Sequence, residues 1–122
     1  MAVTMVGNIT VGYEEGGVTL AQITKQLSAS CGEGPCYAHD SIAATTTDQS
    51  VYPTGLADAD WVVILADGDL SYRNATSSET VKGTIKANQP TVLCLATAIT
   101  GFYLTNAGAT AVNYAILFGA AA

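Results

Sequence analysis

The chain has 122 residues, a formal net charge of −6 and only 11% charged residues. Its length fits one domain with its own core, and no apolar run reaches the ~20 residues that a membrane-spanning helix needs. The four basic residues, Lys25, Arg73, Lys82 and Lys86, form no cluster, which argues against nucleic-acid binding and against a polybasic membrane anchor.

The first elements along the chain are a strand, a turn and an ambiguous segment. Residues 3–11 carry alternating apolar and polar side chains and predict a strand. Residues 14–17 include two glycines and predict a turn. Residues 18–27 have apolar side chains at helical spacing but are rich in β-branched residues. They predict either a short helix or an irregular strand.

Residues 28–52 form the least regular part of the sequence. They contain the segment CGEGPC and a threonine-rich run, and no hydrophobic period emerges. An unstructured stretch of this length is uncommon in a compact domain and often serves a function. We therefore expect one long irregular loop that contacts another subunit.

Two buried strands are predicted in the middle of the chain. Residues 60–66, DWVVILA, are apolar on both faces, as in a central strand, and the Asp-Gly-Asp sequence that follows predicts a turn. Residues 79–87 alternate in polarity, and residues 88–90 predict the next turn. Residues 91–100 form the second buried strand, with Cys94 among its apolar side chains.

The C-terminal residues predict a closing hairpin. A short aromatic strand, residues 102–105, leads through TNAGATA into residues 111–118, which place Val112 and Phe118 on one face. Short strands separated by Gly, Asn and Asp turns indicate an all-β fold. We expect residues 1–122 to form a single antiparallel β-sandwich domain or small barrel, jelly-roll or immunoglobulin-like, with one long irregular loop and at most one short helix.

The cysteines and the single histidine are weak candidates for a zinc site. Cys31, Cys36 and His39 have C-x4-C-x2-H spacing, with Cys94 as a distant fourth ligand, and tetrahedral zinc prefers such ligands. The usual second close pair is missing, and a lone Cys in an apolar strand normally packs as a small hydrophobe. A Cys31–Cys36 disulfide and free thiols are the alternatives. We expect no metal and no cofactor.

No catalytic motif stands out. A nucleophilic pair of Cys36 and His39 would need an orienting group and an oxyanion hole that the sequence does not indicate. Asp67, Asp69 and Ser71 have the spacing of a calcium loop, but the required glycine and closing glutamate are absent. The P-loop, dinucleotide-binding and hydrolase-elbow motifs are also absent. We therefore expect a protein that is not an enzyme.

The surface is expected to be covered by other protein. An ordinary soluble domain carries about 25% charged residues, so this surface must be dominated by small polar and apolar residues. Such surfaces suit subunit contacts, because burying an unpaired charge is costly. Three tyrosines in predicted loops, Tyr37, Tyr52 and Tyr72, are candidate anchors for a protein interface or for stacking on a sugar. Trp61 and Phe118 are expected in the core.

The composition, rich in Ala, Thr and Gly and poor in Lys, resembles that of small tailed-bacteriophage virion structural proteins. The stretch GFYLTNAGATAVNYAILFGA is similar to closing hairpins of such proteins, in which an aromatic strand, an xNxG turn and an apolar strand follow one another. The resemblance implies a capsid decoration (cement) protein, or a fibre or tail component. It implies a homo-oligomer, often a trimer, that binds other virion subunits. It carries over no functional residue.

The resemblance also implies that the protein folds in the host cytoplasm and resides in the virion. The first ten residues, which lack the basic and apolar regions of a secretory signal, agree with this expectation. Residues 28–52 and the two termini are the expected contact regions. Two other functions stay open: a β-sandwich module that binds carbohydrate, and a zinc-stabilised interaction domain. No nucleic-acid or membrane partner is expected.

Overall fold

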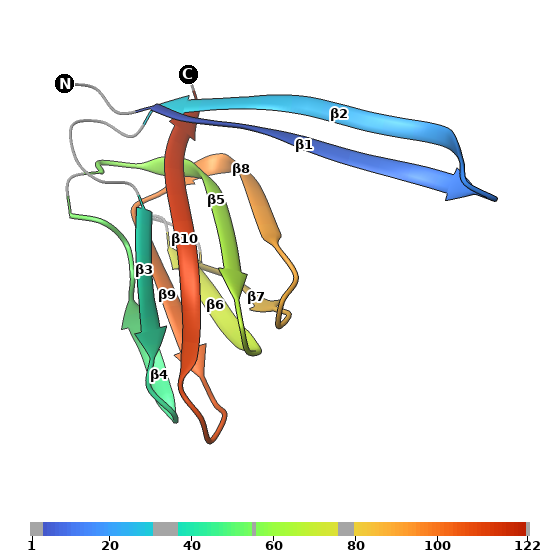
Figure 1. Cartoon of the computed structure of the whole chain (residues 1–122). Helices are drawn as coiled ribbons and strands as arrows, with labels where there is room; N and C mark the ends of the chain where they lie inside the picture. Colours follow the sequence, from blue (N-terminus) through green and yellow to red (C-terminus); the bar gives the residue numbers. More distant parts are fainter. Residues whose placement is uncertain (1–3, 31–36, 55, 76–79, 122) are drawn as a thin grey trace.

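The computed structural model describes residues 4–30, 37–54, 56–75 and 80–121 (Figure 1). All regular elements in these ranges are β-strands, so the short helix considered for residues 18–27 does not form. The strands are β1 (Thr4–Glu15), β2 (Val18–Ser30), β3 (Tyr37–Ile42), β4 (Thr46–Ser50), β5 (Ala59–Ala66), β6 (Leu70–Ala75), β7 (Thr80–Ile85), β8 (Thr91–Ile99), β9 (Gly101–Asn106) and β10 (Val112–Ala121).

Strands β3 to β10 form a sandwich of two antiparallel sheets. The strand order is β3-β10-β5-β8 in one sheet and β4-β9-β6-β7 in the other. The pairing is nested, because β3 pairs with β10, β4 with β9, β5 with β8 and β6 with β7. This is the order of a jelly roll. The predicted β-sandwich is therefore confirmed, in its jelly-roll form, and the sheets do not close into a barrel.

The core lies between the two sheets. Alternate side chains of β10, from Val112 to Phe118, are buried, which confirms the period-2 pattern in the sequence. The Phe118 ring meets Phe102 of the opposite sheet edge to face, with ring centroids 5.7 Å apart. β5 lies between β10 and β8, as expected of a central strand, and its Val62 and Ile64 side chains are fully buried.

Strands β1 and β2 form a long hairpin that projects from the sandwich (Figure 1). We term this hairpin, residues 4–30, the arm. β2 pairs with β10 only where Ser30 and Ala29 meet the C-terminal end of β10, whereas β1 and β2 pair with each other along their whole length. The turn places Gly16 and Gly17 at φ values of 60° and 81°, which glycine adopts at little cost and which suits a two-residue hairpin turn.

The expected long irregular loop over residues 28–52 is wrong, because β3 and β4 occupy much of it. β3 pairs with β10 along its whole length but buries only Ile42 fully. β4 pairs with β9 at the edge of the other sheet and is largely exposed. Neither β3 nor β4 has an alternation of apolar and polar residues that would predict a strand. Both become strands because they pair with strands that are distant in the sequence.

The predicted closing hairpin is also wrong, because β9 and β10 lie in different sheets. The connection between them is tied down by Asn106, which is 1% exposed. Its Nδ2 donates to the carbonyl oxygens of Ile42, Ala43 and Thr110 at 3.1, 3.2 and 2.9 Å. Its Oδ1 accepts from the Gly108 amide at 3.0 Å. The asparagine thus joins the β9–β10 connection to the β3–β4 connection, where the chain crosses between sheets.

Candidate functional site

The two faces of the arm differ in polarity. Residues directly opposite each other in an antiparallel pair share one face. One face is polar and includes Thr10 and Thr24, whose hydroxyls are 3.4 Å apart in a hydrogen bond. The other face, termed the apolar face of the arm, carries Ile9, Val11, Tyr13 and Ile23, with Lys25 paired opposite Ile9.

Within the described ranges, nothing covers the outer part of the apolar face of the arm. Ile23 is 74% exposed, and Val11 and Tyr13 are each 62% exposed. Ile9, nearer the sandwich, is half-buried. An isolated two-stranded hairpin is marginally stable in water, and a contiguous exposed apolar surface is typical of a contact site. The arm therefore has the character of a segment that another polypeptide covers.

The outward face of the β3-β10-β5-β8 sheet is the second apolar surface. Strand register places Tyr37, Leu117, Val63 and Val92 side by side across the four strands. We term these four residues the apolar row. Tyr37, Leu117 and Val92 are exposed large hydrophobic residues, as is Leu65 in the neighbouring position on β5. The DWVVILA segment is thus apolar on both faces. One face of the strand packs in the core, and the other face forms part of this open apolar surface.

The base of the arm already lies over part of the apolar row. Residues 6–9 of β1 line a small hollow together with Val63, Val92 and Leu117. Beside it, a second hollow of about 390 Å³ is lined mainly by Tyr37, Leu65 and Leu117. The arm therefore covers one side of the apolar surface and leaves the other side open.

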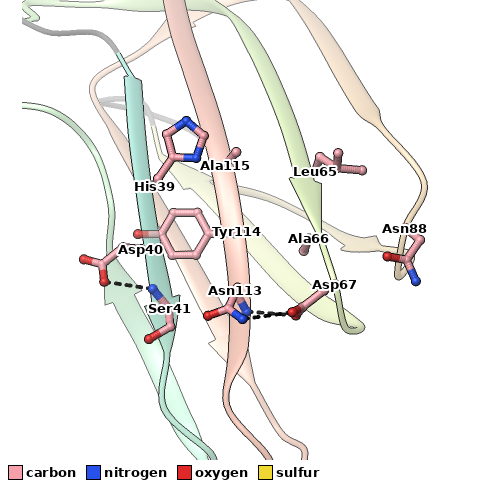
Figure 2. Close-up of a pocket in the computed structure, with 10 residues that line it drawn as sticks. All are labelled: His39, Asp40, Ser41, Leu65, Ala66, Asp67, Asn88, Asn113, Tyr114 and Ala115. Atoms are coloured by element: carbon pink, nitrogen blue, oxygen red, sulfur yellow. Dashed lines mark hydrogen bonds between the residues drawn. The ribbon is translucent and has the colours of Figure 1, made fainter.

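Away from the arm, the same outward face becomes a polar groove of about 550 Å³ (Figure 2). Asp67, which directly follows β5, and Asn113 of β10 lie next to each other in this groove. The Asp67 carboxylate accepts from the Asn113 backbone amide at 2.9 Å and from its Nδ2 at 3.0 Å. The other lining residues are His39, Asp40, Ser41, Leu65, Ala66, Asn88, Tyr114 and Ala115.

The groove does not assemble a hydrolytic triad. His39 lies on β3 and Asp67 at the end of β5, on opposite sides of β10 (Figure 2). The Asp40 carboxylate accepts from the Ser41 backbone amide at 2.8 Å, and no hydrogen bond joins it to His39. The groove instead offers amide, hydroxyl, imidazole and carboxylate groups that suit hydrogen bonds with a polar ligand.

The zinc and disulfide candidates are only partly placed. Cys31 and Cys36 lie outside the described residues, so both alternatives for them stay predictions. His39 is exposed beside Tyr37, with ring centroids 6.4 Å apart. Cys94 is exposed on the outward side of β8, opposite Trp61. The described side chains include no group of three or more metal-binding residues.

The expectation that Cys94 is a buried small hydrophobe is wrong. β8 is the edge strand of its sheet, and within the described ranges only the base of the arm lies over the outward side of that sheet, so an apolar position outside that contact faces solvent. Trp61, expected in the core, is half-buried on the same outward side for the same reason.

The three candidate anchor tyrosines lie in different environments. Tyr37 is 61% exposed on β3 and presents its ring at the end of the apolar row. Tyr72 stacks on Phe102, with centroids 5.4 Å apart and an interplanar angle of 12°. Tyr52 packs edge to face on Phe118, and its hydroxyl donates to the Ile99 carbonyl oxygen at 3.2 Å. Of the three, Tyr37 is the one whose ring is open to a partner.

Two tyrosines at the core have raised pKa values. Burial, and secondarily the negative charge of Asp58, raises the pKa of Tyr52 to about 12. Burial, and secondarily Asp40, also raises the pKa of Tyr114 above its ordinary value. Both pKa values rise because burial against the core disfavours the charged phenolate form. Neither tyrosine therefore has the lowered pKa of an activated nucleophile or base.

Sequence reasoning predicted the strand and turn of the arm but missed that the arm leaves the sandwich. The length of the two strands is a signal that the arm extends beyond the sandwich. β1 and β2 contain 12 and 13 residues, about twice the usual strand length of 5–6 residues. A strand pair that outgrows its sheet must extend beyond it.

Comparison with known proteins gives no match: no family model, no curated protein and no solved structure is similar to this chain. No helix long and apolar enough to cross a membrane occurs in the part of the chain that the structure describes. Functional inference therefore rests on the surfaces of the molecule itself.

Proposed function

We propose that this protein is a non-enzymatic virion structural protein, a capsid decoration (cement) protein that binds and stabilises a capsid lattice as a homo-oligomer. The observation that carries the proposal is the uncovered apolar surface, made of the apolar face of the arm and the apolar row. The chain around it has only 11% charged residues. Such a surface is costly in a free monomer and is covered in an assembled shell.

The proposed mechanism is mass action. Contacts that exist only in the assembled shell stabilise the shell relative to its separate subunits. The arm suits this role, because a strand of 12 residues reaches roughly 40 Å at ~3.4 Å per residue. The jelly roll recurs in viral capsid proteins and in lectins, which supports the proposal at the level of fold analogy only.

Particle binding tests this proposal. Purified protein is mixed with capsids assembled without it, sedimented, and compared with capsids that already carry it. We expect the protein to pellet with the bare capsids and to raise the temperature at which they release their genome, while the occupied capsids bind no more. Genes for capsid, portal or tail proteins beside its gene are a second expected observation. Protein that stays in the supernatant and leaves capsid heat resistance unchanged would reject the proposal.

Carbohydrate binding is a second candidate function, and a fibre or tail component could also use it. The observation that favours it is the polar groove with exposed Tyr37 at its margin, since sugars are bound by hydrogen bonds and by aromatic stacking. A glycan array should then show binding that is lost in Asn113→Ala and Tyr37→Ala. Tyr72→Phe, on the other sheet, is the matched control and should bind as before. An array without any signal would remove this candidate.

A further inference from the structure

We propose that the outward face of the β4-β9-β6-β7 sheet binds a singly charged oxyanion, a carboxylate or a sulfate ester, in a hollow of about 270 Å³ that Arg73 and Lys82 line. This hollow lies on the opposite side of the sandwich from the polar groove and the apolar row. The proposal goes beyond the proposed function, because an anion site here depends neither on capsid binding nor on the polar groove.

Strand register brings together two basic residues that are not neighbours in the sequence. Arg73 of β6 lies directly opposite Lys82 of β7. Like charges in directly opposite positions destabilise a sheet, and this chain has only four basic residues and a net charge of −6. Lys82 is exposed and forms no ion pair with any residue that the structure describes. An anion seated between the two cations replaces this repulsion with attraction.

The Arg73 guanidinium is held in place by two contacts. Its Cζ lies 4.1 Å from the centroid of the Tyr103 ring, and its Nε donates to the Asp48 carboxylate at 3.4 Å. These contacts leave the two terminal nitrogens of the guanidinium without a hydrogen bond to a described residue. Paired N–H groups of this kind bind two oxygens of one oxyanion. Because the side chain is ordered before an anion arrives, binding costs little conformational entropy.

Two hydroxyl groups add uncharged donors to the hollow. Thr105 of β9 and Ser71 of β6 lie directly opposite each other, and both line it. The Thr105 Oγ1 accepts from the Asp48 backbone amide at 2.9 Å, so its hydroxyl hydrogen stays free to donate. Ser71 is exposed, so its hydroxyl can donate to a ligand as well. The hollow thus offers mainly hydrogen-bond donors, and an oxyanion supplies the acceptors.

The charges that line the hollow select a singly charged ligand. Arg73 and Lys82 contribute two positive charges and Asp48 contributes one negative charge, which leaves a net charge of +1. A carboxylate or a sulfate ester neutralises this charge. A phosphate dianion would leave excess negative charge beside Asp48, and a neutral ligand would leave the repulsion between Arg73 and Lys82 unrelieved.

NMR titration of the isotope-labelled full-length protein tests the site. Sodium acetate or sodium methyl sulfate replaces sodium chloride at constant ionic strength, so that general screening does not change. We expect saturable shifts confined to the amides around residues 71–73, 82–84 and 103–105.

A pair of lysine variants separates a built site from general attraction of anions. Lys82→Gln should weaken binding about 10-fold, because it removes one charge-assisted hydrogen bond. The matched control, Lys86→Gln, removes the same charge from an exposed residue outside the hollow and should bind as the wild type does. The amide spectra of both variants without ligand also report that they remain folded.

Three further ligands define the chemistry of the site. Glucose should leave these amides unshifted, and hydrogen phosphate, as the dianion, should bind no more tightly than acetate. Glucuronate that binds more tightly than acetate assigns the site to an acidic sugar, whereas equal or weaker binding assigns it to the free anion.

The proposal is overturned if the shifts do not saturate, if Lys82→Gln binds as the wild type does, or if Lys86→Gln loses as much affinity. Shifts of the same amides by glucose, or tighter binding of the phosphate dianion, would also overturn it. Binding at this hollow should persist in Asn113→Ala, which alters the polar groove. Failure of the capsid or carbohydrate proposals would therefore leave this result standing.

Discussion

Replacing Asn106 with Ala should destabilise the sandwich by roughly 3–5 kcal/mol. The side chain is 1% exposed and makes four hydrogen bonds to the backbone of two connections. Each hydrogen bond contributes about 1 kcal/mol net, and a buried group left without a partner costs about 1–3 kcal/mol. Water can reach the carbonyls of the exposed residues Ala43 and Thr110, so the full penalty applies mainly to the buried Ile42 carbonyl.

Urea unfolding at one protein concentration, followed by Trp61 fluorescence, measures this loss as a shift of the midpoint at constant slope. The matched control is Asn113→Ala, which removes one exposed side-chain hydrogen bond to Asp67 and should cost less than about 1 kcal/mol.

The isosteric variant Asn106→Asp adds a charge test. It places a carboxylate against three carbonyl oxygens, so it should be at least as harmful as the Ala variant at neutral pH. It should partly recover at low pH, where the protonated group can donate. If Asn106→Ala costs no more than Asn113→Ala, the reasoning about this crossing between the sheets is refuted.

Three further predictions follow from local geometry. Gly83→Ala should lower stability by about 1–3 kcal/mol in thermal melts, because an added Cβ would overlap the Tyr72 ring. Gly7→Ala is the control and should be nearly neutral, because an added Cβ there meets nothing within 4 Å. The contribution of Tyr52 to stability should be constant below pH 10 and be lost between pH 10 and 12, because the unfolded chain loses the Tyr52 proton near its ordinary pKa while the folded protein holds it to about 12. Tyr114, whose pKa is also raised, adds to the same fall, so Tyr52→Phe should reduce its slope in urea midpoints without abolishing it, and an equally steep fall would exclude Tyr52 as a source. A thiol reagent should modify Cys94 in the native protein, as seen by peptide mass spectrometry, and modification only after unfolding would contradict its placement.

The sequence predicted the elements whose burial is one-sided and regular. β10 buries every second side chain from Val112 to Phe118, so its alternation was visible without a structure. β5 was recognised as central because both of its faces are apolar. The same pattern hid the apolar outward face of β5 from sequence analysis. Val63 and Leu65 resemble core residues in the sequence, but in the structure they lie on the open face of the sheet.

The elements that depend on distant partners could not be predicted from local pattern. β3 places Asp40 between Ala38 and Ile42 and therefore shows no apolar period, and only its pairing with β10 makes it a strand. The closing segment looked like a hairpin because the hydrogen bonds of Asn106 to the β3–β4 connection cannot be inferred from its neighbours in the chain. The length of its two strands indicates that the arm extends beyond the sheet, but its position depends on the pairing of β2 with the C-terminal end of β10, which no pattern within residues 4–30 encodes.

Hydrogen exchange of the backbone amides in the arm tests most directly whether another polypeptide covers it. A bare two-stranded hairpin opens readily and exchanges almost as fast as an unfolded peptide, whereas a covered one is protected. We predict that amides of residues 4–30 exchange more slowly as the protein concentration rises and approach the protection of β10. Arm amides that exchange at the unfolded rate at every concentration, while β10 stays protected, would contradict the account.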